Sequence, residues 1–108
     1  MEIIPDTSKE AIGGRLVAVR LARDWNSATM AEAIGVSPQR WSNYETGKTG
    51  PSPDILAKVW QVTGATSDFV LFGRYDGMPY ELAQRVRDVI DSRSKDGSSR
   101  PSRRSAAR

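Results

Sequence analysis

A chain of 108 residues with a formal net charge of +3 favours one small domain, whose modest core leaves little room for a large concave active site. It contains no histidine and no cysteine, which excludes disulfides, thiolate metal sites and cysteine nucleophiles and removes the commonest general base. It also has no glycine-rich phosphate loop and no paired-carboxylate motif, so we expect no enzyme, cofactor or metal site. No stretch reaches the roughly 18 apolar residues of a membrane span and no apolar signal core is present, so we expect a cytoplasmic protein without membrane contact.

The positive charge is concentrated near the C-terminus. Residues 92–108 carry six Lys or Arg residues against Asp96 alone, a net charge of +5, which leaves −2 on residues 1–91. An anion-binding surface on the folded part must therefore be a local patch. From Ser94 onward the chain is rich in Ser, Arg and Lys without an apolar period, so we predict a disordered tail over residues 94–108.

The first predicted helix follows an N-terminal arm of residues 1–7. Thr7 and Glu10 have the spacing of a capping box. An apolar set then recurs at four and three residues, on one helical face: Ile12, Leu16 and Val19. We predict that this helix ends near Asp24, and that Gly13 and Gly14 weaken its first turn by about 1 kcal/mol each relative to alanine.

Two short helices are predicted on either side of a tight turn. Asn26 can cap a helix over residues 27–34, whose inner face carries Met30, Ala31 and Ile34. The turn and the start of the next helix follow in order: Gly35, Val36, the N-cap Ser37 and Pro38. The helix after the turn is the third in the chain. It runs over about residues 37–45, with Trp41 and Tyr44 facing inward. A turn this short forces a steep crossing, which is the geometry of a helix-turn-helix unit.

After a loop over residues 46–53, rich in glycine and proline, we predict two more helices. Asp54 caps the fourth, which runs to about Val62 with an apolar set of Leu56, Val59 and Trp60. The fifth is capped by Ser67 or Asp68 and contains Phe69, Val70 and Phe72. All three tryptophans fall on inward positions of these patterns, so core packing is preferred to base stacking: Trp25, Trp41 and Trp60.

A last helix is predicted over about residues 80–93. It carries an apolar stripe at helical spacing: Leu82, Val86, Val89 and Ile90. This stripe must be covered either by the chain's own domain or by the same helix of a second copy.

Matching residues run through the first five helices with a constant family spacing: Leu16, Arg20, Met30-Ala31, Ile34-Gly35-Val36-Ser37, Trp41, Tyr44-Glu45, Gly47-Lys48, Pro51-Ser52, Leu56, Val59, Asp68-Phe69 and Gly73. With this pattern the chain resembles the lambda-repressor-like (Xre/Cro) helix-turn-helix domain. The resemblance implies an all-α fold: a compact five-helix bundle over residues 8–73, with an additional C-terminal helix in residues 74–93 and the basic tail. It also implies sequence-specific binding of double-stranded DNA, and with it association with the nucleoid.

The resemblance places the base-reading positions on the helix after the turn, at Pro38, Gln39, Ser42 and Asn43. Pro38 has no donor, so it can supply only shape or an apolar contact. Gln39 and Asn43 are four residues apart on one face, and each can bond bidentately to adenine.

Phosphate contacts are expected from the starts of the second and third helices and from the loop after the third: Asn26, Ser27, Ser37, Arg40, Thr46, Lys48 and Thr49. The family usually has glutamine where this chain has Ser27, which favours a phosphate contact there over a base contact. Arg40 contacts a phosphate, or a guanine if the helix rotates slightly, or is a solvated charge. The resemblance further implies that Arg20 pairs with Glu45, which orients the reading helix without touching DNA.

These residues predict a transcriptional regulator, a repressor that binds a palindromic operator as a homodimer. Its dimer interface would include the last helix or the fourth and fifth helices. The alternative is an antitoxin that binds a toxin protein and represses its own operon. The basic tail either adds phosphate contacts or has no role.

Overall fold

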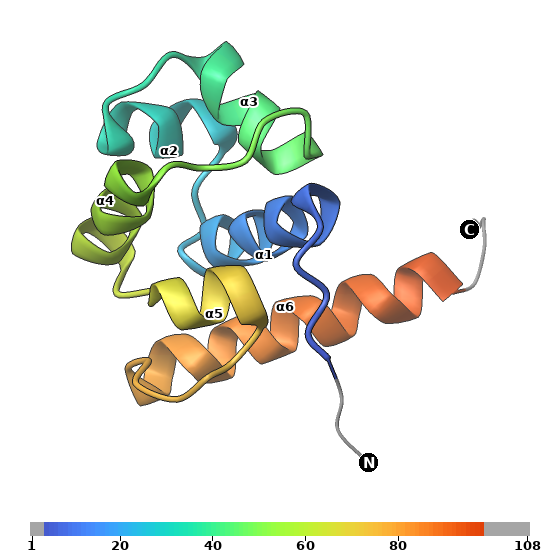
Figure 1. Ribbon diagram of the computed structural model, residues 1–108. Helices are drawn as coiled ribbons and strands as arrows, with labels where there is room; N and C mark the ends of the chain where they lie inside the picture. The colour runs from blue at the N-terminus through green and yellow to red at the C-terminus, as the bar shows by residue number, and fades with distance from the viewer. Residues whose placement is uncertain (1–3, 99–108) are drawn as a thin grey trace.

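The computed structural model describes residues 4–98, with side-chain detail for residues 4–94. Its helices are α1 (Lys9–Ala22), α2 (Ser27–Ile34), α3 (Pro38–Thr46), α4 (Pro53–Thr63), α5 (Ser67–Phe72) and α6 (Tyr80–Ser98). The predicted all-α fold is confirmed. α1 crosses the middle of the molecule and packs against α3 on one side and against α5 and α6 on the other (Figure 1). No helix in the described part of the chain is long and apolar enough to cross a membrane.

The N-caps of α1 to α5 are Ser, Thr or Asn residues whose side chains accept a backbone N–H. Three of them lie one or two residues from the predicted position. Asn26 and Ser37 cap α2 and α3 as predicted. α1 is capped by Ser8 and not by Thr7, α4 by Ser52 and not by Asp54, and α5 by Thr66 and not by Ser67 or Asp68. For α4 the reason is that Pro53 lacks an N–H and therefore takes the first helical position, which moves the cap to the preceding serine.

The core is assembled around Trp41, whose side chain has no solvent exposure. The other fully buried large side chains come from all the helices except α3: Leu16, Val19, Met30, Ile34, Val59, Phe69, Val70 and Val86. Trp25 is half-buried, and Trp60 is 57% exposed, so the prediction that all three tryptophans pack in the core is wrong for Trp60.

α4 is rotated relative to its predicted orientation. Its buried residues are Ile55, Val59 and Thr63, while Leu56 is half-buried and Trp60 points outward. The sequence of α4 carries apolar residues on two faces, so helical periodicity alone does not select the face that meets the core.

Arg15 in α1 forms hydrogen bonds that hold α5 against α1. Its guanidinium donates to the carbonyl oxygens of Val70 (3.1 Å) and Leu71 (2.9 Å) near the C-terminus of α5, and to that of Asp6 (2.7 Å) in the N-terminal arm. The Ser8 backbone N–H donates to the Asp6 carboxylate and is the main cause that lowers the pKa of Asp6, with smaller contributions from the Ser8 hydroxyl and Arg15. These contacts fix where α5 and the arm lie against α1.

α6 begins at Tyr80 as predicted but extends to Ser98. The predicted disorder is therefore wrong for residues 94–98; residues 99–108 lie outside the described residues. Residues 94–96 include neither glycine nor proline, so the sequence there does not end the helix. Leu82 and Val86 are buried against the chain's own domain, and α6 packs mainly against α1.

Candidate nucleic-acid interface

α2 and α3 are joined by a three-residue turn whose geometry depends on Gly35. This glycine ends α2 in the left-handed region, at φ +88°, and its N–H donates to Ala31 and Glu32. Val36 is half-buried and packs against the core, and the Ser37 hydroxyl accepts the Arg40 backbone N–H at 3.1 Å. The turn therefore sets α3 across the end of α2 with one face of α3 outward, as a helix-turn-helix unit requires.

The outward face of α3 carries the predicted base-reading residues. Pro38 and Gln39 are exposed, and Ser42 and Asn43 are half-buried. Gln39 Nε2 donates to Asn43 Oδ1 at 3.0 Å, so the two amides lie on one face and are joined to each other. This face presents amide groups of the kind that bind base edges in the major groove.

The predicted phosphate-binding residues fall into two groups. Asn26 and Ser37 use their side-chain oxygens as helix caps, with Asn26 Oδ1 accepting the Thr29 N–H at 2.8 Å. Thr46 donates its hydroxyl to the Ser42 carbonyl at 3.0 Å. The two caps use only acceptor oxygens, so the Asn26 amide N–H groups and the Ser37 O–H can still donate to a phosphate, whereas the Thr46 hydroxyl already donates within α3.

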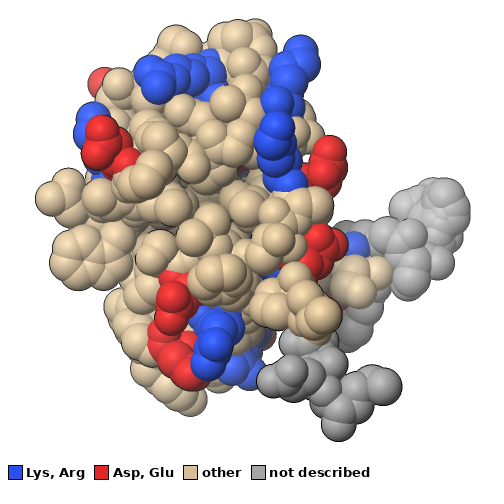
Figure 2. All heavy atoms as spheres, viewed as in Figure 1, with Lys and Arg blue, Asp and Glu red and all other residues tan. Residues whose placement is uncertain are grey.

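The second group of predicted phosphate-binding residues takes no part in these helix caps. Lys48 and Thr49 are exposed on the loop after α3, and Ser27 is half-buried at the start of α2. Arg40 is exposed, and its Nε donates to Tyr44 Oη at 3.1 Å. Basic side chains stand over α3 and the adjoining loops in the upper part of Figure 2. These positions surround the outward face of α3.

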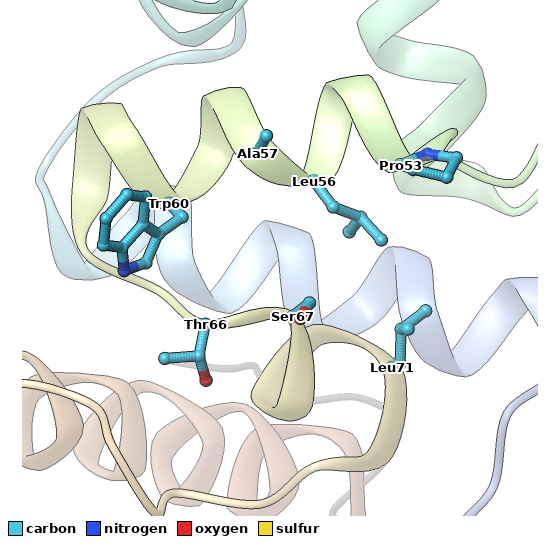
Figure 3. Close-up of a pocket in the computed structure, with 7 residues that line it drawn as sticks. All are labelled: Pro53, Leu56, Ala57, Trp60, Thr66, Ser67 and Leu71. Atoms are coloured by element: carbon cyan, nitrogen blue, oxygen red, sulfur yellow. The ribbon is translucent and has the colours of Figure 1, made fainter.

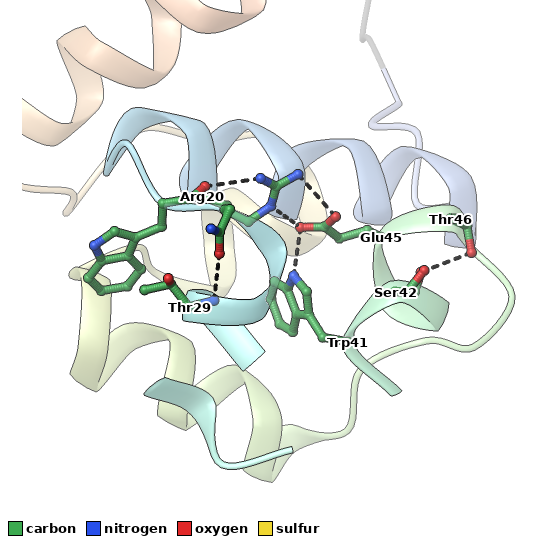
Figure 4. Close-up of polar contacts among 8 residues, drawn as sticks. Arg20, Thr29, Trp41, Ser42, Glu45 and Thr46 are labelled. Carbon is green, nitrogen blue, oxygen red and sulfur yellow. Dashed lines mark hydrogen bonds and ion pairs between the residues drawn. The ribbon is translucent and has the colours of Figure 1, made fainter. Parts of the chain in front are cut away.

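Behind that face, a hydrogen-bonded cluster holds α3 against α1 (Figure 4). Arg20 Nε lies 2.6 Å from Glu45 Oε2, and Arg20 Nη2 donates to Glu45 Oε1 at 3.3 Å. The two side chains are 15% and 10% exposed. Sequence reasoning named this pair but missed its other partners: Trp41 Nε1 donates to Glu45 Oε2 at 2.6 Å, and Arg20 Nη1 donates to the Trp25 carbonyl at 3.0 Å.

Gly13 also positions α3, and sequence reasoning treated it only as a weak point in α1. A Cβ at Gly13 would collide with the Glu45 carbonyl oxygen and lie 2.6 Å from that of Tyr44. A Cβ at Gly14 would meet nothing within 4 Å. Gly13 therefore permits the backbones of α1 and α3 to touch, and the signal for this in the sequence is a glycine inside an otherwise good helical pattern.

The described residues contain no group of His, Cys, Asp or Glu side chains that could hold a metal ion. The model of the helix-turn-helix domain family matches residues 11–69, which include the whole α2–turn–α3 unit. The chain belongs to this helix-turn-helix family. The resemblance to Xre-like helix-turn-helix domains is thereby confirmed.

Relatives of this helix-turn-helix protein are regulators by name. It is 32% identical over 63 residues to the SPbeta prophage-derived uncharacterized HTH-type transcriptional regulator YonR of Bacillus subtilis, a stretch that spans 58% of each protein. It is similar to two crystal structures of the clp gene regulator ClgR of Corynebacterium glutamicum. In these the sequence identities are 28% and 27%, the TM-score is 0.56 for both, and the match covers 79% and 91% of this chain and 99% of each ClgR chain.

Proposed function

We propose that this protein is a transcriptional regulator that binds double-stranded DNA sequence-specifically, with α3 in the major groove. One observation carries the proposal: α3 is locked on its inner side by Arg20, Trp41 and Glu45, and presents the joined amides of Gln39 and Asn43 on its outer side. A rigid helix with amide groups facing outward is suited to reading base edges. The regulators ClgR and YonR, to which the chain is similar, support the assignment to regulation.

The regulatory effect we propose is repression at a palindromic operator. A single α3 reads about half of such a site, and a two-fold dimer places two recognition helices about 34–36 Å apart, one turn of DNA. Selection of bound duplexes from a random-sequence pool tests this directly. We expect enrichment of a site with two-fold symmetry, whereas retention of all sequences alike would overturn sequence-specific binding.

Lys48 supplies a phosphate contact in this proposal, because it is exposed on the loop that continues α3. Lys48→Ala is expected to weaken binding to every sequence alike and to reduce the slope of log affinity against log salt by about one. Binding titrations at several salt concentrations, with the selected site and an unrelated duplex, measure both effects. A loss confined to the selected site would show that Lys48 contacts a base and not a phosphate.

The dimer we propose is formed through α4 and α5. An open groove of about 570 Å³ lies between them, lined by Pro53, Leu56, Ala57, Trp60, Thr66, Ser67 and Leu71. Figure 3 shows Leu56 and Leu71 on opposite walls of the groove near Pro53, and the indole of Trp60 at the far end from Pro53. One face thus offers both a projecting aromatic ring and an apolar hollow. A two-fold interface is self-complementary because each copy presents the same surface, and a ring and a hollow on one face can satisfy this requirement.

Trp60→Ser tests this interface. Trp60 is 57% exposed, so its loss is expected to leave folding almost unchanged but to weaken dimerisation by roughly 30-fold or more, as buried interface tryptophans do. Gln61→Ser, at the next exposed position of α4, is the matched control. Sedimentation equilibrium gives the dissociation constants. Equal constants for wild type and Trp60→Ser would place the interface elsewhere.

A further inference from the structure

Arg40 stands on the flank of α3, at the border between its outward and its buried side. Successive residues of an α-helix lie about 100° apart around the axis, which places Arg40 between Asn43, on the outward side, and Tyr44, on the buried side. Arg40 is exposed and forms no ion pair with any residue that the structure describes. Its positive charge is therefore available to an anion that approaches this flank.

The hydroxyl of Tyr44 holds the Arg40 guanidinium from the core side. Arg40 Nε donates to Tyr44 Oη at 3.1 Å. Tyr44 is 3% exposed, and its ring meets the ring of the fully buried Trp41 edge-on, with the two centroids 6.0 Å apart. The hydroxyl is thus a fixed point on the core. An arginine tied to it has fewer conformations to lose on binding than one that extends freely into solvent.

The bond to Tyr44 leaves the outer end of the guanidinium free. Arginine has five N–H donors in one plane, and this bond uses the one on Nε, so the four on Nη1 and Nη2 can still donate. Two such nitrogens match two oxygens of one phosphate group. A helix with its side chains is about 10–12 Å across, nearly the width of the major groove, so its flanks lie beside the phosphates along the groove edges.

We infer that Tyr44 is a positioning residue, which holds Arg40 ready to bind a backbone phosphate beside the major groove. The inference rests on the proposed function. The sequence leaves three roles open for Arg40: a phosphate contact, a guanine contact and a solvated charge. The tie to the core on the flank of α3 selects the first of them. Because the guanidinium is ordered before DNA arrives, the contact costs less entropy.

Arg40→Ala tests the contact itself, in titrations of the selected site and of an unrelated duplex at several salt concentrations. We expect binding to both duplexes to weaken by about tenfold, the value of one charged hydrogen bond, and the slope of log affinity against log salt to fall by about one. Arg74→Ala is the control for charge. Arg74 is exposed directly after α5, on the side of α1 opposite α3 (Figure 1), so its removal is expected to change affinity and slope much less.

Tyr44→Phe tests the positioning, because it removes only the hydroxyl and keeps the ring against Trp41. We expect it to weaken binding to both duplexes by about 2- to 10-fold, the cost of ordering one free side chain. The salt slope and the urea midpoint are expected to stay near those of wild type, since Arg40 keeps its charge and the core keeps its packing. In the Arg40→Ala background, Tyr44→Phe is expected to cause no further loss.

Four results would overturn the inference. A loss in Arg40→Ala confined to the selected site would show a base contact, and no loss at all would show a solvated charge. A Tyr44→Phe variant that binds like wild type would show that the hydroxyl positions nothing, and a loss that persists in the Arg40→Ala background would show that it acts without Arg40. A wild type without sequence preference would instead contradict the proposed function, because the phosphate contact can be measured on any duplex.

Discussion

Replacing Gly13 with alanine is expected to destabilise the domain by about 2–3 kcal/mol, although alanine is the better helix former. The added methyl group would collide with the carbonyl oxygens of Glu45 and Tyr44. These are backbone atoms of α3, so α1 and α3 must move apart to accept it. The same movement shifts the outward face of α3, so we expect DNA affinity to fall as well.

Gly14→Ala is the matched control for Gly13→Ala. It stands next to Gly13 in α1, but its side is open, so alanine there is expected to stabilise the domain by about 1 kcal/mol. Urea unfolding monitored by circular dichroism measures both changes. If the two variants shifted the midpoint in the same direction, the close approach of α1 and α3 would not be a constraint on stability.

Glu45→Gln is expected to cost about 2–4 kcal/mol of stability and to weaken specific DNA binding. Glutamine keeps an oxygen for the Trp41 N–H but leaves the Arg20 side chain, which is only 15% exposed, without a counter-charge. Removing one partner of a fully buried ion pair typically costs about 3–5 kcal/mol of stability. The expected loss is smaller here because the side chains of Arg20 and Glu45 are slightly exposed.

The double variant Arg20→Met with Glu45→Gln separates the charge from the packing. It removes both charges and keeps the acceptor for Trp41, so it is expected to be more stable than Glu45→Gln alone. Denaturant titrations of the two single variants and the double variant give the coupling energy. A double variant whose loss equals the sum of the single losses would show that the pair is not coupled.

The helix-turn-helix unit could be predicted in detail because its signals are local. Asn26 and Ser37 are cap residues, Gly35 supplies the left-handed turn, and Pro38 fits only at the start of a helix. Each acts within a few residues of sequence, so its effect does not depend on the rest of the fold. The pairing of Arg20 with Glu45 is long-range and was available only through the family resemblance.

The features missed depend on contacts between elements. Gly13 interrupts a helical pattern in the sequence, but its role appears only when α3 lies against α1. Trp60 could have pointed inward or outward, because α4 has two apolar faces and only packing against α2 and α5 selects one of them. The hydrogen bond that joins Gln39 to Asn43 needs particular rotamers, which residue types and spacing do not specify.

The central claim is that the outward face of α3 reads DNA sequence, and parallel selections of duplexes by wild type and Gln39→Ala test it most directly. We predict that wild type enriches a defined two-fold site and that Gln39→Ala enriches the same site with one base pair in each half no longer specified. A Gln39→Ala variant that selected the wild-type site with every position intact would contradict the claim.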